Sequence, residues 1–131
     1  MAGAYQEIPI GYDFFFTTNV STRVAALSAN LTSATFSWVA REFDSDMETT
    51  LTNVFAVASN TTANGTVTVN TTSKVATITL KSAYTATAAE ASLLFWMLTV
   101  DQANGLKYVL DQGRAATIAV PANAAGAGVG A

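Results

Sequence analysis

The sequence predicts an all-β protein, an antiparallel β-sandwich of immunoglobulin-like or jelly-roll-like type. It should have seven or eight strands and one short helical turn near residues 85–91. Apolar and polar residues alternate with period two, and turn residues recur roughly every eight to twelve positions. Helical segments do not alternate with the strands, which argues against an α/β fold. The chain of 131 residues has the length of one domain.

Three strands are expected in the first half of the chain, over residues 12–20, 34–43 and 51–58. In the second of these, Phe36, Trp38 and Ala40 alternate with other side chains, as on a strand buried on one side. In the first, three consecutive phenylalanines at 14–16 place apolar side chains on both faces. A strand of that kind is central to two packed layers or meets a partner.

The second half has five expected strands, over residues 66–70, 74–80, 93–101, 106–111 and 114–120. Between the second and third of these, the Ala-rich segment 83–91 predicts a helical turn, with Thr85 or Thr87 as its N-cap. The pair Asn104-Gly105 predicts a type I′ hairpin turn. A second turn is expected at Gln112-Gly113.

The expected domain organisation is an N-terminal arm at 1–11, the sandwich at 12–120 and a flexible Gly/Ala-rich tail at 121–131. The N-terminus has no basic segment followed by an apolar one, so no export signal is expected. The longest apolar run, residues 93–98, is far shorter than the roughly 20 residues of a membrane-spanning helix. We therefore expect no membrane partner.

Composition excludes several kinds of chemistry. The chain has no Cys and no His, which removes disulfides, thiolate nucleophiles and histidine-based catalysis. Six basic residues are scattered singly in a chain of net charge −3, so a nucleic-acid partner is not expected. Asp44, Asp46 and Glu48 have the spacing that begins some calcium loops, but the central Gly and terminal Glu of such a loop are missing. We expect no catalytic, metal or cofactor site.

The shortage of charge is the most informative feature. Charged residues make up 11% of the chain, whereas about 25% is usual in globular domains. Uncharged surfaces tend to associate, so the composition favours a subunit whose faces meet other subunits. The regular T-x-T rungs of an ice-binding surface occur at only two places, 66–68 and 77–79. The residues expected to contact neighbours lie in the two arms and on the first strand: Tyr5, Ile8, Ile10, Phe15 and Val129.

Short motifs add a family resemblance. Residues 31–35 read LTSAT, residues 101–105 read DQANG, and residues 113–120 read GRAATIAV. They resemble the LTGAT turn, the D-x-x-G hairpin and the closing G-x-L/I-x-V strand in small β-sandwich domains of tailed-bacteriophage virion proteins. The N-terminal domain of baseplate upper proteins is the nearest in kind. The first motif has Ser for Gly, the second has one extra residue, and the third is a looser match.

The resemblance implies a virion structural protein without catalytic residues. The expected function is capsid decoration, in which a cement protein binds between capsomers and stabilises the head. Its partners would be other copies of itself, with a trimer expected, and a major capsid protein or another virion protein. It would be made in the host cytoplasm and reside on the capsid exterior or the tail. A tail or baseplate adaptor remains open, as does a carbohydrate- or surface-binding module.

Overall fold

The computed structural model describes residues 5–21, 34–42, 53–70, 72–89, 92–103 and 105–120. The elements are β1 (Gln6–Pro9), β2 (Phe14–Asn19), β3 (Thr35–Glu42), β4 (Asn53–Ala58), β5 (Gly65–Asn70), β6 (Val75–Leu80), α2 (Ser82–Thr85), β7 (Leu93–Asp101) and β8 (Lys107–Ile118). The acidic cluster at 44–48 and the tail at 121–131 lie outside the described residues.

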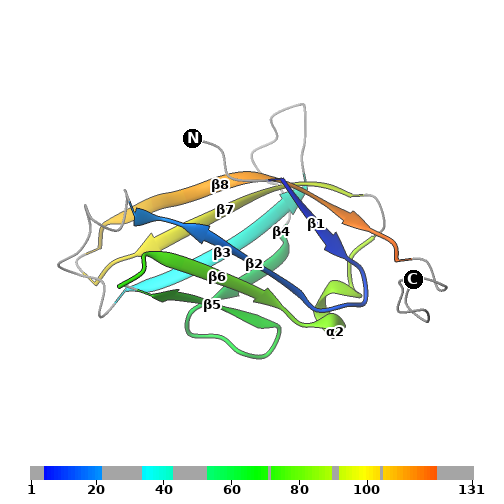
Figure 1. The fold of residues 1–131 in the computed structure, drawn as a ribbon, viewed down its shortest axis with the longest axis horizontal. Coiled ribbons are helices and arrows are strands. Elements are labelled where there is room, and N and C mark those ends of the chain that lie inside the picture. Colours follow the sequence, from blue (N-terminus) through cyan, green and yellow to red (C-terminus); the bar gives the residue numbers. More distant parts are fainter. Residues whose placement is uncertain are drawn as a thin grey trace.

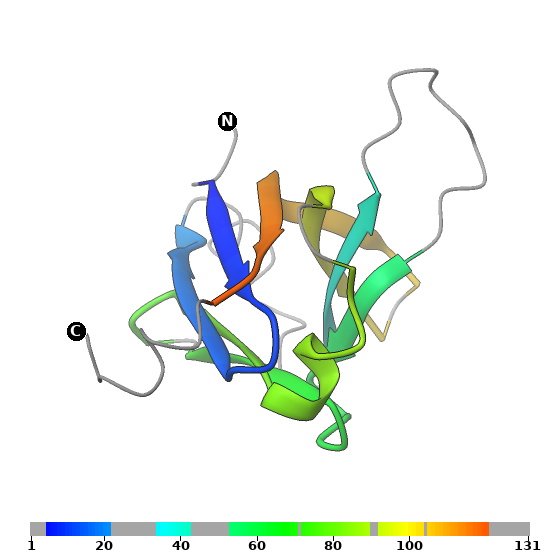
Figure 2. The same cartoon turned by 90° about the vertical axis from the view of Figure 1, so that its right-hand side faces the viewer.

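Two sheets form a sandwich, as the alternation predicts. One has five strands in the order β1-β8-β7-β3-β4, and the other has three in the order β2-β6-β5 (Figure 1). All neighbours are antiparallel except β1 and β8, which are parallel. The end-on view in Figure 2 shows the two layers with α2 at one end.

The strand order is that of an immunoglobulin-type sandwich. Strands β2, β6 and β5 take the places of B, E and D, and β3, β7 and β8 take those of C, F and G. Strand β4 extends the five-stranded sheet in the place of C′. Of the two sandwich types expected from the sequence, the immunoglobulin-like one is therefore observed.

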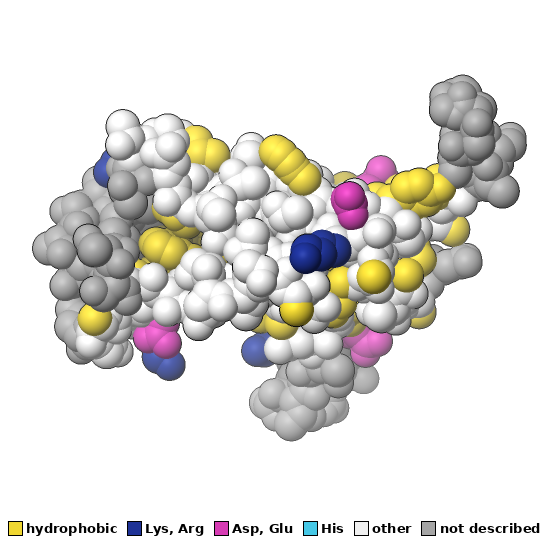
Figure 3. Space-filling model, turned by 90° about the horizontal axis from the view of Figure 1, so that it is seen from below, with side chains coloured by type: hydrophobic (Ala, Val, Ile, Leu, Met, Phe, Trp, Pro, Cys, Tyr) yellow, Lys and Arg dark blue, Asp and Glu magenta, His cyan; other side chains and the backbone are white. Residues whose placement is uncertain are grey.

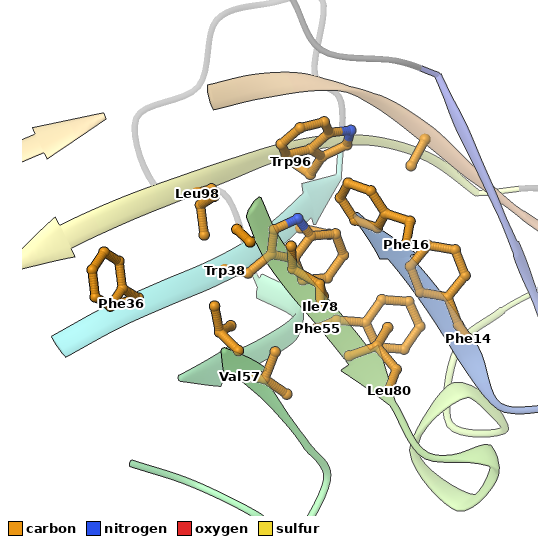
Figure 4. Close-up of a cluster of buried hydrophobic side chains, with 14 of the residues drawn as sticks. Phe14, Phe16, Phe36, Trp38, Phe55, Val57, Ile78, Leu80, Trp96 and Leu98 are labelled. Atoms are coloured by element: carbon orange, nitrogen blue, oxygen red, sulfur yellow. The ribbon is translucent and has the colours of Figure 1, made fainter. Parts of the chain in front are cut away.

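Aromatic side chains fill the centre of the sandwich. Phe16 on β2 meets Trp96 on β7 edge to face, with ring centroids 5.3 Å apart, and Trp38 on β3 lies 6.1 Å from Phe16 (Figure 4). Antibody domains join strands B and F here with a disulfide packed against a Trp on strand C. This chain has no Cys and joins the same strands by aromatic packing. Trp38 and Trp96 are fully buried, and the alternation around Trp38 predicts this for the first of them.

The last hairpin differs from the expected one. Strands β7 and β8 pair as predicted, but residues 102–106 connect them in place of a two-residue turn. The turn expected at Gln112-Gly113 is absent, because β8 runs unbroken and Gly113 pairs with Trp96. A bulge at Leu110 absorbs the irregularity, since Leu98 faces Asp111 while Thr99 faces Val109.

The helical turn begins earlier than predicted, at Ser82, and Thr85 is not its N-cap. The Asp13 carboxylate accepts a hydrogen bond of 2.7 Å from the Ser82 N–H, which satisfies one of the free donors at the start of the helix. Thr85 is fully buried and ties α2 to the turn between β1 and β2. Its Oγ1 accepts a hydrogen bond from the Gly11 N–H (3.0 Å) and donates one to the Tyr12 carbonyl (2.8 Å).

The expected N-terminal arm contains a strand of the domain itself. Residues 6–9 form β1 along β8, and the Ile10 N–H donates to the Ile118 carbonyl at 2.9 Å. Ile8 packs into the core with none of its surface exposed. This corrects the expectation that Ile8 contacts a neighbouring subunit, because its side chain is buried in the core of its own chain.

Candidate interaction surfaces

The outer face of the β2-β6-β5 sheet is an uncharged grid. The side chains of alternate residues point away from the core, and the strand register places them in three rows across the sheet. The rows are Phe15–Thr79–Thr66, Thr17–Thr77–Thr68 and Asn19–Val75–Asn70. None of these nine positions carries a charge. In Figure 3, seen from the side of β5 and β6, uncharged polar side chains and backbone cover most of the middle of the surface.

One end of this grid is hollowed. The open hollow has a volume of about 440 Å³ and is lined by Thr68, Val69, Asn70, Ser73, Val75 and Thr77. The Asn70 side chain shapes its rim, because its Oδ1 accepts hydrogen bonds from the Thr72 and Ser73 N–H groups. Its lining consists of hydroxyl, amide and apolar groups, so the hollow suits contact with an uncharged group.

The outer face of the five-stranded sheet is different. An apolar patch crosses it through Ala56, Val39 and Met97, which lie in one cross-strand row. The next row places Phe95 between Arg41 and Arg114. This face therefore combines apolar contact area with positive charge, whereas the grid on the other sheet has neither charge nor a continuous apolar patch.

A second hollow lies at the far end of the five-stranded sheet. It has a volume of about 350 Å³ and is lined by Ser37, Thr99, Val100, Asp101, Lys107, Tyr108 and Val109. The Lys107 ammonium lies 3.8 Å from the Asp101 carboxylate, and both side chains are more than half exposed. An ion pair so exposed contributes little to stability. Both charged groups are accessible to solvent at the hollow.

The five residues expected at interfaces differ in their exposure to solvent. Tyr5 and Phe15 are 58% and 59% exposed, and Ile10 is half-buried beside β8. Ile8 is buried, as described above, and Val129 lies outside the described residues. Tyr5 directly precedes β1, and Phe15 lies on β2 in the other sheet, so the structure does not gather the described residues of this set into one site.

The most exposed large apolar residue of the described chain is Leu93, which is 64% exposed and is not among the residues expected at interfaces. Leu106 and Val109 are also exposed and are not among them either. The run at 93–98 carried a usable signal, because its odd-numbered positions fall on the outer face once the even-numbered ones face the core. The exposure of Val109 had no such signal, because it depends on the bulge in β8.

Among the described residues, no three Asp or Glu side chains lie together as metal ligands would. No described helix has the length and apolar character needed to cross a bilayer. No protein-family model and no curated protein matches this chain. The fold and its surfaces therefore carry the functional argument alone.

Proposed function

We propose that this protein is a structural component of a tailed-bacteriophage virion, a capsid decoration (cement) protein that binds between capsomers and stabilises the head. It acts without catalysis or cofactor, as a homo-oligomer for which we propose a trimer, on the capsid exterior. The proposal combines the motif resemblance with one structural observation, the uncharged outer face of the β2-β6-β5 sheet.

That face supports the proposal for a physical reason. A solitary soluble domain usually has about 25–35% charged residues on its surface, with both signs interspersed. The nine outward positions of the three-stranded sheet have none, and the described charged residues that adjoin its strands in sequence, Asp13, Lys74 and Lys81, lie beyond the strand ends. A face of this kind has little electrostatic desolvation cost to overcome when another protein covers it.

The mechanism is mechanical. A cement protein holds together subunits that internal pressure or heat would separate, and each contact can be weak because many copies act on one shell. A rigid sandwich with two chemically different faces can bridge two neighbours. The grid would contact an uncharged surface, and the patch around Met97 and Phe95 would contact an apolar surface with acidic groups.

The direct test uses heads that lack this protein. Purified protein is added to such heads, which are then heated, and release of DNA or of capsid protein is followed. We expect co-sedimentation with the heads and a higher disruption temperature. Failure to bind heads, together with binding to purified tails or baseplates, would replace the cement function by the tail or baseplate adaptor.

A carbohydrate-binding module is the second candidate, favoured by the hollow at the end of the five-stranded sheet. Thr99, Asp101 and Lys107 line it and supply hydroxyl and charged groups that can hydrogen-bond a sugar. A glycan array distinguishes the two candidates. Glycan binding that is lost in Asp101→Ala, by a protein that ignores capsids, would establish the sugar site and reject the cement function.

A further inference from the structure

The sandwich has four edge strands, and three of them are closed. Exposed edges invite pairing with another strand, and native proteins block them with side-chain caps, charges, proline or covering elements. Strand β4 is capped by hydroxyl groups: the Ala56 N–H donates to the Tyr84 hydroxyl (2.8 Å), and the Ala58 N–H donates to Thr61 Oγ1 (3.0 Å). The Ser59 N–H donates to the Phe36 carbonyl of β3. Because successive backbone N–H groups along a strand point to opposite sides, the N–H groups of Ala58 and Ala56 alternate with it and point away from β3.

Strands β1 and β5 are closed by other means. Only Glu7 and Pro9 of β1 point their backbone away from β8, and they supply a charge and a residue without an N–H group. In β5 the outward-pointing backbone groups belong to Gly65, Val67 and Val69. Gly65 is buried and Val67 has no exposed surface, so the chain itself covers that edge along most of its length.

Strand β2 has no such protection. The Val20 N–H bonds the Lys74 carbonyl, so Phe14, Phe16 and Thr18 bond β6 while Phe15, Thr17 and Asn19 turn their backbone groups outward. All three outward residues are exposed, and no described residue hydrogen-bonds their N–H or C=O groups. The strand contains no charge and no proline. In Figure 2, β2 forms the left margin of the described sandwich.

The open edge of β2 is complementary to the β2 edge of a second copy. In an antiparallel pair of two β2 strands, Thr17 faces Thr17 of the second copy and Phe15 faces Asn19. Every outward N–H and C=O group of the three residues then gains a partner. The outer rows of uncharged residues continue across the junction, and β2 itself brings no charge to it. Because the other three edges are closed, β2 of a second copy is the fitting partner among the described strands.

We propose that two copies of this chain pair through their β2 edges and form one continuous six-stranded sheet about a twofold axis at Thr17. The pairing closes after two copies, since it uses the same edge of both. It does not depend on a virion, and a trimer would have to form through another surface. One strand pair buries well below the roughly 1,200 Å² of a standard interface, so the dimer should form in a concentration-dependent manner.

A cysteine at the axis tests the geometry, because the natural chain has none. Facing residues of a hydrogen-bonded antiparallel pair have Cα atoms about 5.5 Å apart, within the roughly 4.4–6.8 Å that a disulfide spans. Under mild oxidation Thr17→Cys should form a covalent dimer about tenfold faster or more than Thr68→Cys, because pairing raises the effective thiol concentration. Thr68 is an exposed residue on the same face, on β5. Equal rates would overturn the proposal.

Removal of one N–H group tests the hydrogen bonding. Thr17→Pro deletes the central outward donor of β2 and leaves the bonds to β6 intact, whereas Thr17→Val keeps the donor. In sedimentation equilibrium over a wide concentration range, the natural protein and Thr17→Val should approach twice the monomer mass. Folded Thr17→Pro should stay monomeric. Thr17→Lys places two like charges at the axis and should also stay monomeric, so it replaces the proline variant if that variant does not fold.

Two other results would reject the dimer. A natural protein that stays monomeric at the highest concentration rejects it outright. Concentration-independent protection of the Thr17 amide from hydrogen exchange, lost on deletion of residues 121–131, would assign the edge to the chain's own tail. Dimers that form equally well in Thr17→Pro and Thr17→Lys would place the contact on another surface.

Discussion

The two faces of the β2-β6-β5 sheet are built from the same three strands and differ in nearly everything else. The inner face carries buried Phe14, Phe16, Ile78 and Leu80, and the outer face carries Phe15 with threonine and asparagine. One residue of register separates Phe16, which is 8% exposed, from Phe15, which is 59% exposed. Folding therefore constrains the inner face strictly and the outer face hardly at all.

This contrast means that packing in the core does not determine the residues of the outer face. Nothing in the packing of the sandwich requires threonine in place of lysine or glutamate at positions such as 68 and 77, because their side chains point away from the core. Strand propensity favours threonine over lysine and glutamate, but it does not by itself exclude charge from a whole face. We proposed above that contact with another molecule accounts for the uncharged face, and the following substitutions measure how far the two faces differ.

The largest effect is expected from neighbouring phenylalanines. Phe16→Ala should lower the free energy of unfolding by about 3–5 kcal/mol, since it removes the ring that joins Trp38 and Trp96 across the core. Phe15→Ala should change it by about 0.5 kcal/mol or less. Denaturant titrations of both variants check the pair. A large loss in Phe15→Ala would show that the described outer face is covered by the chain itself.

A glycine at the start of β5 should give the next largest effect. Gly65 has φ +145°, and a Cβ there would lie 2.0 Å from the Thr79 carbonyl oxygen. Backbone strain of this kind costs about 1–3 kcal/mol, and the clash with β6 adds to it. Gly11→Ala is the control, since Gly11 has φ +82° with no atom within 4 Å of such a Cβ. Thermal unfolding should rank Gly65→Ala as clearly the less stable variant.

Hydroxyl groups inside and outside the sandwich form the third comparison. Thr85→Val should cost about 1–3 kcal/mol, because the Gly11 N–H and the Tyr12 carbonyl lose their partner in a buried place. Thr77→Val on the outer face removes a hydroxyl with no hydrogen bond to a described residue, so its effect on stability should be small. Similar losses in both variants, measured by chemical denaturation, would contradict the distinction between the faces.

The smallest effect on stability should come from a charge on the grid. Thr68→Lys should alter the free energy of unfolding by about 0.5 kcal/mol or less, since Thr68 is exposed. It should nevertheless weaken the binding to heads proposed above, because the lysine would have to be desolvated at the contact. Unfolding and head-binding assays on one preparation separate the two quantities. Unchanged head binding would remove the grid from the proposed interface.

The sandwich and its inner face follow from the sequence because period-two alternation reports burial directly. The alternation in β3 and β6 correctly places Trp38 and Ile78 in the core, and Trp96 of the continuous apolar run in β7 is buried there too. Where strand pairing overrode local turn preference, prediction was wrong. Gln112-Gly113 lies within β8 because β7 supplies partners for the whole segment.

The surfaces were harder to predict. Exposed Phe15 follows from the alternation around Phe14 and Phe16, but burial of Ile8 depends on a parallel pairing with a strand more than a hundred residues away. No local pattern reports such a contact. The closed edges were equally hidden, because the hydroxyl caps on β4 come from Thr61 and from Tyr84 of α2.

The pairing of β1 with β8 sets a condition on how the molecule is made. Residues 6–9 are synthesised more than a hundred residues before their partners at 115–118. The five-stranded sheet cannot be completed until residues 115–118 have been made, and contacts of such long sequence separation form slowly. A product that ends before β8 would leave β1 without its strand partner, so this edge of the sheet closes only in a chain that contains both strands.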